Sequence, residues 1–599
     1  MDAADIFVKS QIELVRQGLF LKVFGNQKAM DKLKELASSI DAGWPGINSK
    51  AILAETHDQV GRYHECGQWC SRDDAQQQLN QLESDLPVPM EKRDLARARL
   101  MLVLQCAIVE LRLRNYRGAR EILDKAINIF ERHVTRRGPG LHRQHIESLF
   151  YFWRGRTFAL EYAFESAEAD FQKALAVADL NLEDKLIKKV FSLTDEEEKT
   201  KERHRQVAAG NFVLATVLGF GLGNTKQLAG KLHESLQFLR LAVPLSRGSE
   251  DFHRRGFAHL LLGTALRSQG DDPESAKKHI KDSLILFGES EDGKVLDDTP
   301  GRVHYLHLAR ANHQLALHTY DQAPYTPDPP KELKAALELN KKAECYSMDP
   351  TCKSHYDPVL NYGIAVLRSL LETALENFPA GLSKAEEAIL MIENRSLPAW
   401  ISGWAWTAKG RALANLVPGN TPLTDQDRNN ISKAQISFEK TYADENARPA
   451  DRAAAHFYLS RLYSKTDDRS GARNHYDLGK KMLGKNPEYR WLRDLAKGTA
   501  HMLGRDDDGF RCVFDIEELL KEGQDKREKD LWSYISNSVV AGAREKLLKL
   551  KLKDLEESSV KTVADELGIS HATLYAWLDA AGEKTPRQRK RSVPVKPSS

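Results

Sequence analysis

The stretch AAAHFYLSRLYSKTDDRSGARNHYDLG, residues 453–479, decides the fold. Its first half, up to Tyr463, has the apolar spacing of an amphipathic helix. After the polar turn, Ala472, Tyr476 and Gly479 follow at spacings of four and three, which place them on one face of a second helix. The stretch therefore predicts a helical hairpin with small residues where its two helices cross.

The same pattern recurs between about Asn48 and Asn486. Two clear copies are Ala119, Leu123, Ala126 and Ala167, Phe171, Ala174. Looser copies are Ala75, Leu79, Leu82; Ser235, Leu239, Ala242; Ala336, Asn340, Ala343; and Ala434, Phe438, Thr441. An amphipathic helix precedes each copy, for example residues 149–158 and 257–266. The pattern indicates an array of helical hairpins.

This array resembles the tetratricopeptide repeat family, whose repeats are about 34 residues long. The residues that carry the resemblance best are His456, Leu459, Ser460, Tyr463, Ala472, Tyr476 and Gly479, followed by Tyr151, Gly155, Phe158, Ala167, Phe171 and Ala174. The resemblance implies an all-α solenoid, because stacked hairpins bury their core against neighbours and leave an inner groove. A helical bundle without repeats is the alternative.

The resemblance also implies that a ligand contacts the first helix of each pair. Registering the repeats on their small residues pairs an aromatic residue with an arginine on that helix in three places: Phe152 with Arg156, Trp404 with Arg411, and Phe457 with Arg461. Guanidinium and aromatic groups suit an acidic peptide or a phosphate-bearing ligand. The alternative is that the aromatic rings belong to the core and the arginines extend along the surface.

Near the C-terminus, the stretch VKTVADELGISHATLYAWL, residues 560–578, predicts two short helices that meet at Gly568. It resembles a bacterial helix-turn-helix of the Fis type, also found in resolvases. The resemblance implies a double-stranded DNA site at Lys561, Ser570, His571, Thr573 and Tyr575. An ordinary helical hairpin that closes the fold is the alternative.

The segments on either side of the helix-turn-helix extend this prediction. The tail, residues 583–599, is basic and rich in proline, so we expect it to be disordered and to contact DNA through Arg587, Arg589, Lys590 and Arg591. A solvated tail without a partner is the alternative. The resemblance places a dimer interface ahead of the DNA-reading helices, and we expect residues 510–556 to form a homodimer.

Length and composition bound the organisation of the chain. Its 599 residues predict an N-terminal helical cap at 1–48, the repeat array at 49–505, a linker and helix-turn-helix at 510–582, and the tail. The formal net charge is only +3, so DNA binding must be local. Six scattered cysteines suit a reduced cytosol, and no stretch is apolar for the thickness of a bilayer. We expect a cytoplasmic protein with no membrane contact.

No catalytic, metal or cofactor motif emerges. The glycine run from Gly219 to Lys226 lacks the Gly-Lys-Ser/Thr ending of a phosphate-binding loop. His64, Cys66 and Cys70 match no common zinc spacing, and buried thiols are expected there. We therefore expect a protein that is not an enzyme and that binds no cofactor and no metal.

Together these patterns predict a DNA-binding transcriptional regulator whose repeat array binds a protein or peptide partner. The alternative is a non-enzymatic scaffold or adaptor, or a sensor subunit of a bacterial defence system, that uses the C-terminal domain for assembly.

Overall fold

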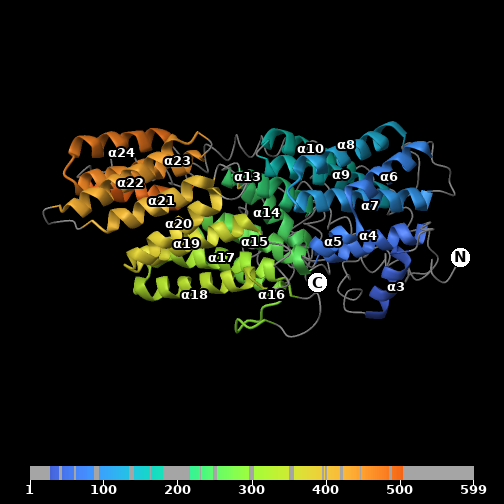
Figure 1. Cartoon of the computed structure of the whole chain (residues 1–599), viewed down its shortest axis with the longest axis horizontal. Helices are drawn as coiled ribbons and strands as arrows, with labels where there is room; N and C mark the ends of the chain where they lie inside the picture. The colour runs from blue at the N-terminus through green and yellow to red at the C-terminus, as the bar shows by residue number, and fades with distance from the viewer. Residues whose placement is uncertain are drawn as a thin grey trace, which may run out of the picture. The chain divides into compact units, whose positions relative to one another are not determined.

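The structure is a computed structural model, and it describes residues 27–38, 44–59, 63–85, 93–133, 141–161, 163–179, 216–228, 231–246, 252–295, 303–349, 357–393, 397, 401–417, 423–445, 447–483 and 489–503. Within these ranges the chain is all-α; an isolated bridge between Glu289 and Val295 is the only β-type pairing (Figure 1). The predicted fold class is confirmed. None of the described helices is both long and apolar enough to cross a membrane.

The chain divides into two compact units, with the boundary inside α15. Unit 1 ends at Leu262, and its described elements are α3 (Gln27–Ala37), α4 (Trp44–Gln59), α5 (Tyr63–Trp69), α6 (Arg72–Ser84), α7 (Arg93–Arg112), α8 (Tyr116–His133), α9 (Leu141–Leu160), α10 (Phe164–Asp179), the π-helix η2 (Thr216–Gly223), α13 (Asn224–Leu228), α14 (Leu232–Ser246) and the start of α15 (Phe252–Gln269). One continuous apolar core runs from α4 to α14.

Unit 2 begins at Gly263. It contains the end of α15, then α16 (Pro273–Leu286), α17 (Tyr305–Gln322), the 3-10 turn η3 (Ala323–Tyr325), α18 (Pro329–Ser347), α19 (Pro358–Ala374), α20 (Phe378–Glu393), α21 (Ser402–Asn415), α22 (Asp425–Ala443), α23 (Pro449–Lys465), α24 (Arg469–Leu483) and α25 (Arg490–Met502). From α16 to α25 each helix packs on its sequence neighbours, and α17, α19, α21, α23 and α25 also contact one another in succession (Figure 1). This order is a solenoid of helix pairs.

Small residues set the close crossing within each pair. A Cβ atom on Gly155 would lie 2.7 Å from the Phe171 ring, and one on Gly410 would lie 2.5 Å from the Phe438 ring. In the pair α23–α24, Ser460 takes the equivalent place and donates a hydrogen bond to the carbonyl of Ala472 at 2.7 Å. The residues of the recurring pattern from Ala75 to Tyr476 are all buried. The predicted register of the repeats is confirmed.

The turns between paired helices share an unusual backbone conformation. Arg114, Glu376 and Asp467 have φ angles of 66°, 63° and 60°, in the left-handed region that residues other than glycine rarely adopt. Each lies two residues after the end of a first helix, namely α7, α19 and α23. The next residue directly precedes the second helix. The side chains of Asn115 and Asp468 cap their helices by accepting hydrogen bonds from the backbone N–H groups of Gly118 and Gly471, at 3.0 and 2.9 Å. Three hairpins therefore use one turn geometry.

Candidate functional site

An arginine follows the small residue at the crossing in three first helices. Arg156 follows Gly155, Arg411 follows Gly410, and Arg461 follows Ser460. Successive residues in a helix point about 100° apart, so these side chains turn away from the second helix of their own pair. In unit 1, Arg156 donates to the carbonyl of Phe220 in η2 at 2.9 Å. In unit 2, the other two arginines link first helices of different pairs.

Arg411 lies between α17 and α23. Its Nη2 donates to the hydroxyl of Tyr320 on α17 at 3.0 Å, and its Cζ lies 5.1 Å from the centre of the Tyr458 ring on α23. Arg461, three residues after Tyr458, reaches α25 instead. Its Nε donates to Thr499 Oγ1 at 2.9 Å and its Nη2 to the carbonyl of Leu495 at 3.2 Å. Arg411 thus contacts α23 through Tyr458, and Arg461 extends from α23 to α25 along the same row of first helices.

Neither guanidinium forms an ion pair with a carboxylate in the described part of the chain; their partners there are hydroxyls, a carbonyl and an aromatic ring. Burial lowers the pKa of Arg461; Tyr458 opposes this shift, and the neighbouring Arg411 adds to it. Buried charges are normally paired, because an unpaired charge loses its hydration without compensation. This cationic pair is therefore a place where an anion would be stabilised.

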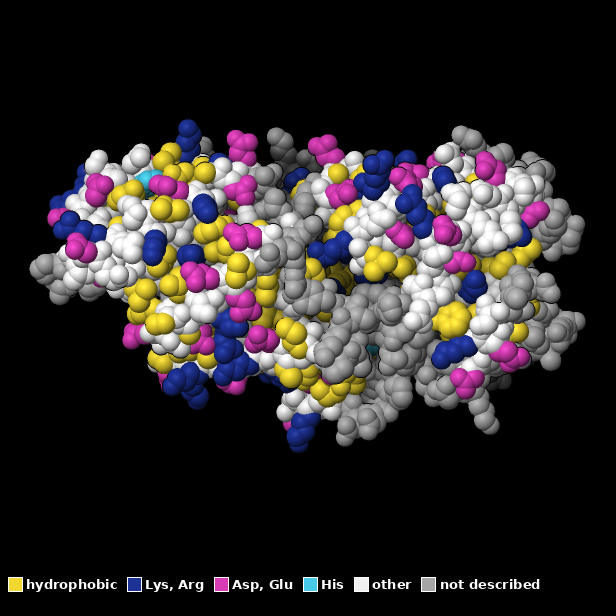
Figure 2. Space-filling model, viewed as in Figure 1, with side chains coloured by type: hydrophobic (Ala, Val, Ile, Leu, Met, Phe, Trp, Pro, Cys, Tyr) yellow, Lys and Arg dark blue, Asp and Glu magenta, His cyan; other side chains and the backbone are white. Residues whose placement is uncertain are grey.

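Two carboxylates on the neighbouring first helices α17 and α19 are already in ion pairs. Asp321, next to Tyr320, bonds Arg267 at 2.7 Å, and burial raises the pKa of Asp321. Glu372 on α19 bonds Arg368 at 2.9 Å. Over the helices of unit 2 that face the viewer in Figure 2, basic and acidic side chains are likewise interspersed. The unbalanced pair Arg411 and Arg461 differs from these surroundings.

A third cation lies one helical turn beyond Arg461. Lys465 Nζ donates to the carbonyl of Ala414 on α21 at 3.2 Å, and burial lowers the pKa of Lys465. Like the arginines, it has no carboxylate within ion-pair distance among the described residues. We call Arg411, Arg461 and Lys465, with the hydroxyls of Tyr320 and Tyr458, the inner cationic surface.

The last described helix of unit 2, α25, contacts the turn between α15 and α16. Arg490 Nη1 on α25 donates to the carbonyl of Gly270, between α15 and α16, at 2.6 Å. Its guanidinium also lies 4.5 Å from the centre of the Tyr325 ring, and the Tyr325 hydroxyl donates to Asp494. The bond from Arg490 to Gly270 joins residues 220 positions apart in the sequence. The end of the described part of unit 2 therefore contacts its beginning.

The aromatic residues predicted to bind the partner lie apart from this surface. Phe152 and Phe457 are 2% and 0% exposed and pack in the cores of their units. Trp404 is half-buried, stacks on Tyr362 at 6.3 Å and lies 4.8 Å from the Arg448 guanidinium. Arg411 and Arg461 lie on the row of first helices of unit 2, whereas Phe152 and Phe457 lie in the apolar cores of their units.

The predicted DNA-binding residues and the predicted dimer segment lie outside the described residues. These are Lys561, Ser570, His571, Thr573, Tyr575, Arg587, Arg589, Lys590 and Arg591, together with residues 510–556. They stay predictions from the sequence.

The glycine run of unit 1 has a packing role. Gly221 lies in η2, and a Cβ on it would come 2.9 Å from the Phe171 ring. Lys226, which ends the run, bonds Glu168 and Glu234 at 2.8 Å each. Its charge is thus balanced within the protein.

The cysteines Cys66, Cys70 and Cys106 are buried free thiols. A hydrogen bond with Cys106 is the largest cause that raises the pKa of Cys70, and burial adds to it. Such thiols are poor nucleophiles and poor metal ligands.

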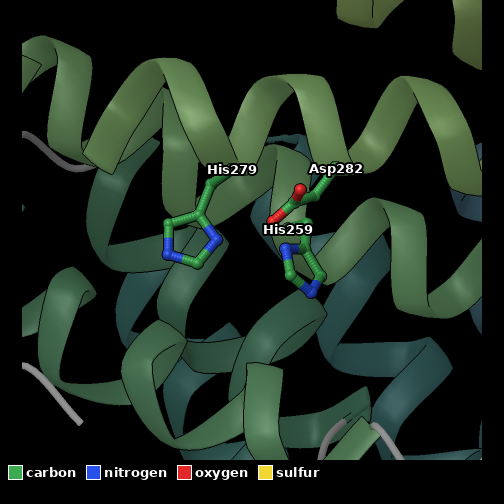
Figure 3. Close-up of side chains that lie close together, drawn as sticks. All are labelled: His259, His279 and Asp282. Carbon is green, nitrogen blue, oxygen red and sulfur yellow. The ribbon is translucent and has the colours of Figure 1, made fainter. Parts of the chain in front are cut away.

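One group of metal-binding residue types occurs in the described ranges. His279 and Asp282 are three residues apart on α16, and His259 belongs to α15; their ligand atoms lie within 4.8 Å of one another (Figure 3). His259 belongs to unit 1, whereas the other two belong to unit 2. We infer no site from residues that are divided between the units.

Comparison with known proteins gives no family. No family model and no curated protein matches the sequence. The tetratricopeptide domain of P58(IPK) is 13% identical over 72% of this chain and 98% of that chain, with a TM-score of 0.21. A chain of the APC/C hetero-tetramer Cut9–Hcn1 is 11% identical over 83% of this chain and 96% of that chain, also with a TM-score of 0.21. At such a TM-score the likeness carries no argument about function.

Proposed function

We propose that the chain is a non-enzymatic scaffold that binds an acidic segment of a partner protein at the inner cationic surface of unit 2. The observation that carries this proposal is the half-buried pair Arg411 and Arg461, whose partners in the described residues are all uncharged. A carboxylate held between two guanidinium groups forms short, charge-assisted hydrogen bonds. The partner would thus supply the negative charge that unit 2 lacks there.

The solenoid supports the same proposal. Stacked helix pairs bury their core only against their neighbours, so the row of first helices stays available as a binding surface. In unit 2 a hydrogen bond from Arg490 on α25 to the carbonyl of Gly270, after α15, joins the two ends of the described row. A surface that is already organised loses little entropy when it binds a ligand.

A defined peptide tests the proposal. Fluorescence anisotropy would compare a labelled peptide that contains three glutamates with the same peptide containing three glutamines, using the full chain. We expect binding of the glutamate peptide only, weakened at least about tenfold in Arg411→Gln/Arg461→Gln, since each charge-assisted bond contributes about 1.5–3 kcal/mol. Arg469→Gln is the matched control, because Arg469 is 85% exposed at a turn. Equal binding of both peptides, or unchanged binding by the double variant, contradicts the proposal.

We also propose, from the sequence, that residues 560–599 bind double-stranded DNA and that the chain acts as a transcriptional regulator. The run from Ala564 to Tyr575 and the basic tail after Gly582 support this second function. Replacing Arg587, Arg589, Lys590 and Arg591 with Gln should weaken binding of the full chain to all duplexes alike and reduce its salt dependence, whereas Tyr575→Ala should reduce sequence preference. Electrophoretic mobility shifts at several salt concentrations measure both effects; no binding to any duplex contradicts this function.

A further inference from the structure

The number of unbalanced charges on the inner cationic surface bears on what kind of anion fits it. Arg411, Arg461 and Lys465 carry up to three positive charges, and none forms an ion pair with a carboxylate among the described residues. One carboxylate would supply a single negative charge. A phosphate monoester carries about −1.5 to −2 at neutral pH, and it does so in one compact group.

The hydrogen-bond donors point to the same chemistry. Arg411 donates one hydrogen bond and Arg461 donates two within the described residues, whereas a guanidinium has five N–H donors. Tyr320 accepts from Arg411, which leaves the proton of its own hydroxyl for an acceptor. A carboxylate has two oxygens to receive such donors, and a phosphate monoester has three terminal oxygens.

The residue types also fit a phosphate. The planar guanidinium binds two phosphate oxygens at once, and two such groups at an angle to each other can hold one tetrahedral phosphate. The two arginines come from neighbouring first helices, α21 and α23; Arg411 lies 5.1 Å from the centre of the Tyr458 ring on α23, the helix that also carries Arg461. Their positions are fixed by Tyr320 on one side and by Thr499 on the other.

We propose that Arg411 and Arg461 bind one phosphate monoester group, carried on a phosphorylated side chain of the partner segment. This inference rests on the proposed scaffold function and specifies the chemistry of its ligand. Lys465 adds charge at the edge of the site, and the hydroxyl of Tyr320 donates to a phosphate oxygen.

Three labelled peptides of one neutral sequence, with phosphoserine, glutamate or serine at the centre, test the inference with the full chain. By fluorescence anisotropy at pH 7.5, we expect the phosphoserine peptide to bind at least about tenfold more tightly than the glutamate peptide, and inorganic phosphate to compete. The affinity should fall between pH 7.5 and 5.5, because the second ionisation of the phosphate has a pKa of about 6.

Variants separate a specific site from general attraction. Arg411→Gln/Arg461→Gln should lose the preference for phosphoserine. Arg411→Lys/Arg461→Lys keeps the positive charges but loses the planar arrangement of guanidinium N–H donors, so it should keep only part of the affinity for the phosphoserine peptide. Arg469→Gln should behave like the wild type. Circular dichroism of each variant checks that it is folded.

The outcomes distinguish this inference from the proposed function. Two outcomes would show that the phosphate inference is wrong while the scaffold function stands. In the first, the glutamate peptide binds as tightly as the phosphoserine peptide. In the second, the tri-glutamate peptide binds and the phosphoserine peptide does not. If the double Gln variant keeps the preference for phosphoserine, the assignment to these arginines is wrong. If no acidic or phosphorylated peptide binds, both proposals fail.

Discussion

Arg411 and Arg461 lie on neighbouring first helices of unit 2, close enough for the charge of Arg411 to lower the pKa of Arg461, and no carboxylate among the described residues pairs with either. The two are like charges in a half-buried position: burial and the charge of Arg411 lower the pKa of Arg461, whereas for Arg411 burial is outweighed by Tyr320 and Tyr458, which raise its pKa. Their presence is explained if a ligand supplies the opposite charge, and this relation between stability and binding can be measured.

The unliganded chain should gain stability when the arginine pair is neutralised. In Arg411→Gln/Arg461→Gln the repulsion and the desolvation of two cations disappear, whereas the amide groups can still donate hydrogen bonds. We expect the free energy of unfolding to stay the same or to rise by about 1 kcal/mol. Urea unfolding of the full chain measures it. A loss of more than about 2 kcal/mol would mean that the pair is structural.

The glycine at the crossing of α21 and α22 should not tolerate a branched side chain. In Gly410→Val the new Cβ would meet the Phe438 ring at 2.5 Å, so helices or rings must shift, at a cost of about 1–3 kcal/mol. Gly67→Ala in α5 is the control, because a Cβ there would meet its nearest neighbour, Val109, at an ordinary 3.8 Å. Thermal unfolding compares the two; equal melting temperatures would contradict the close crossing.

A glycine at the shared turn position should stabilise the hairpins. Glu376 has a φ of 63°, which costs a residue with a side chain about 1 kcal/mol and costs glycine little. Glu376→Gly should therefore raise the stability of unit 2 by up to about 1 kcal/mol, less the greater entropy of the unfolded chain. Asp467→Gly, at the equivalent turn, should act in the same direction. Chemical denaturation of both variants checks this, and a loss above about 1 kcal/mol in both would argue against the turn geometry.

Acid should destabilise unit 2 through its buried histidines. Burial lowers the pKa of His313, His318 and His456 to about 4 each, from an ordinary 6.5. The unfolded chain therefore takes up protons near pH 6.5 that the folded chain does not take up until about pH 4, and stability falls as the pH falls through this window.

The loss is at most about 3 kcal/mol for each histidine, at 1.36 kcal/mol per pKa unit. His318→Leu removes one such group, and it should reduce the slope of unfolding free energy against pH between pH 6.5 and 4.5 by up to about 1.4 kcal/mol per pH unit. Denaturant titrations at several pH values measure the slope. An unchanged slope would show that His318 titrates alike in both states.

The sequence predicts the helix pairs because their crossings depend on local spacing. Ala472 and Tyr476 lie on one face of one helix, and both are buried. The arginines are also predictable, since Arg411 and Arg461 directly follow the small crossing residue. Their neighbours are not predictable: Tyr320 is 91 residues from Arg411, and Thr499 is 38 residues from Arg461. Which of them meet depends on how successive pairs stack.

The sequence also could not show whether the aromatic rings predicted to bind the partner are exposed. Phe152 and Phe457 stand beside the arginines in the repeat pattern, and the spacing cannot distinguish a ring that faces a groove from one that is covered by the next helix. In the structure, Phe457 packs with residues of α25, such as Leu492 and Ala496, in one core cluster. Burial by a neighbouring pair is a property of the stacked array, which a single repeat does not contain.

The most direct test of the central claim is an experimental structure of the full chain with an acidic or phosphorylated peptide bound. We expect oxygen atoms of one peptide acid group to lie about 2.7–2.9 Å from guanidinium nitrogens of both Arg411 and Arg461. A peptide bound elsewhere on the chain, with these two arginines still bonded only to Tyr320, Thr499 and Leu495, would contradict the account.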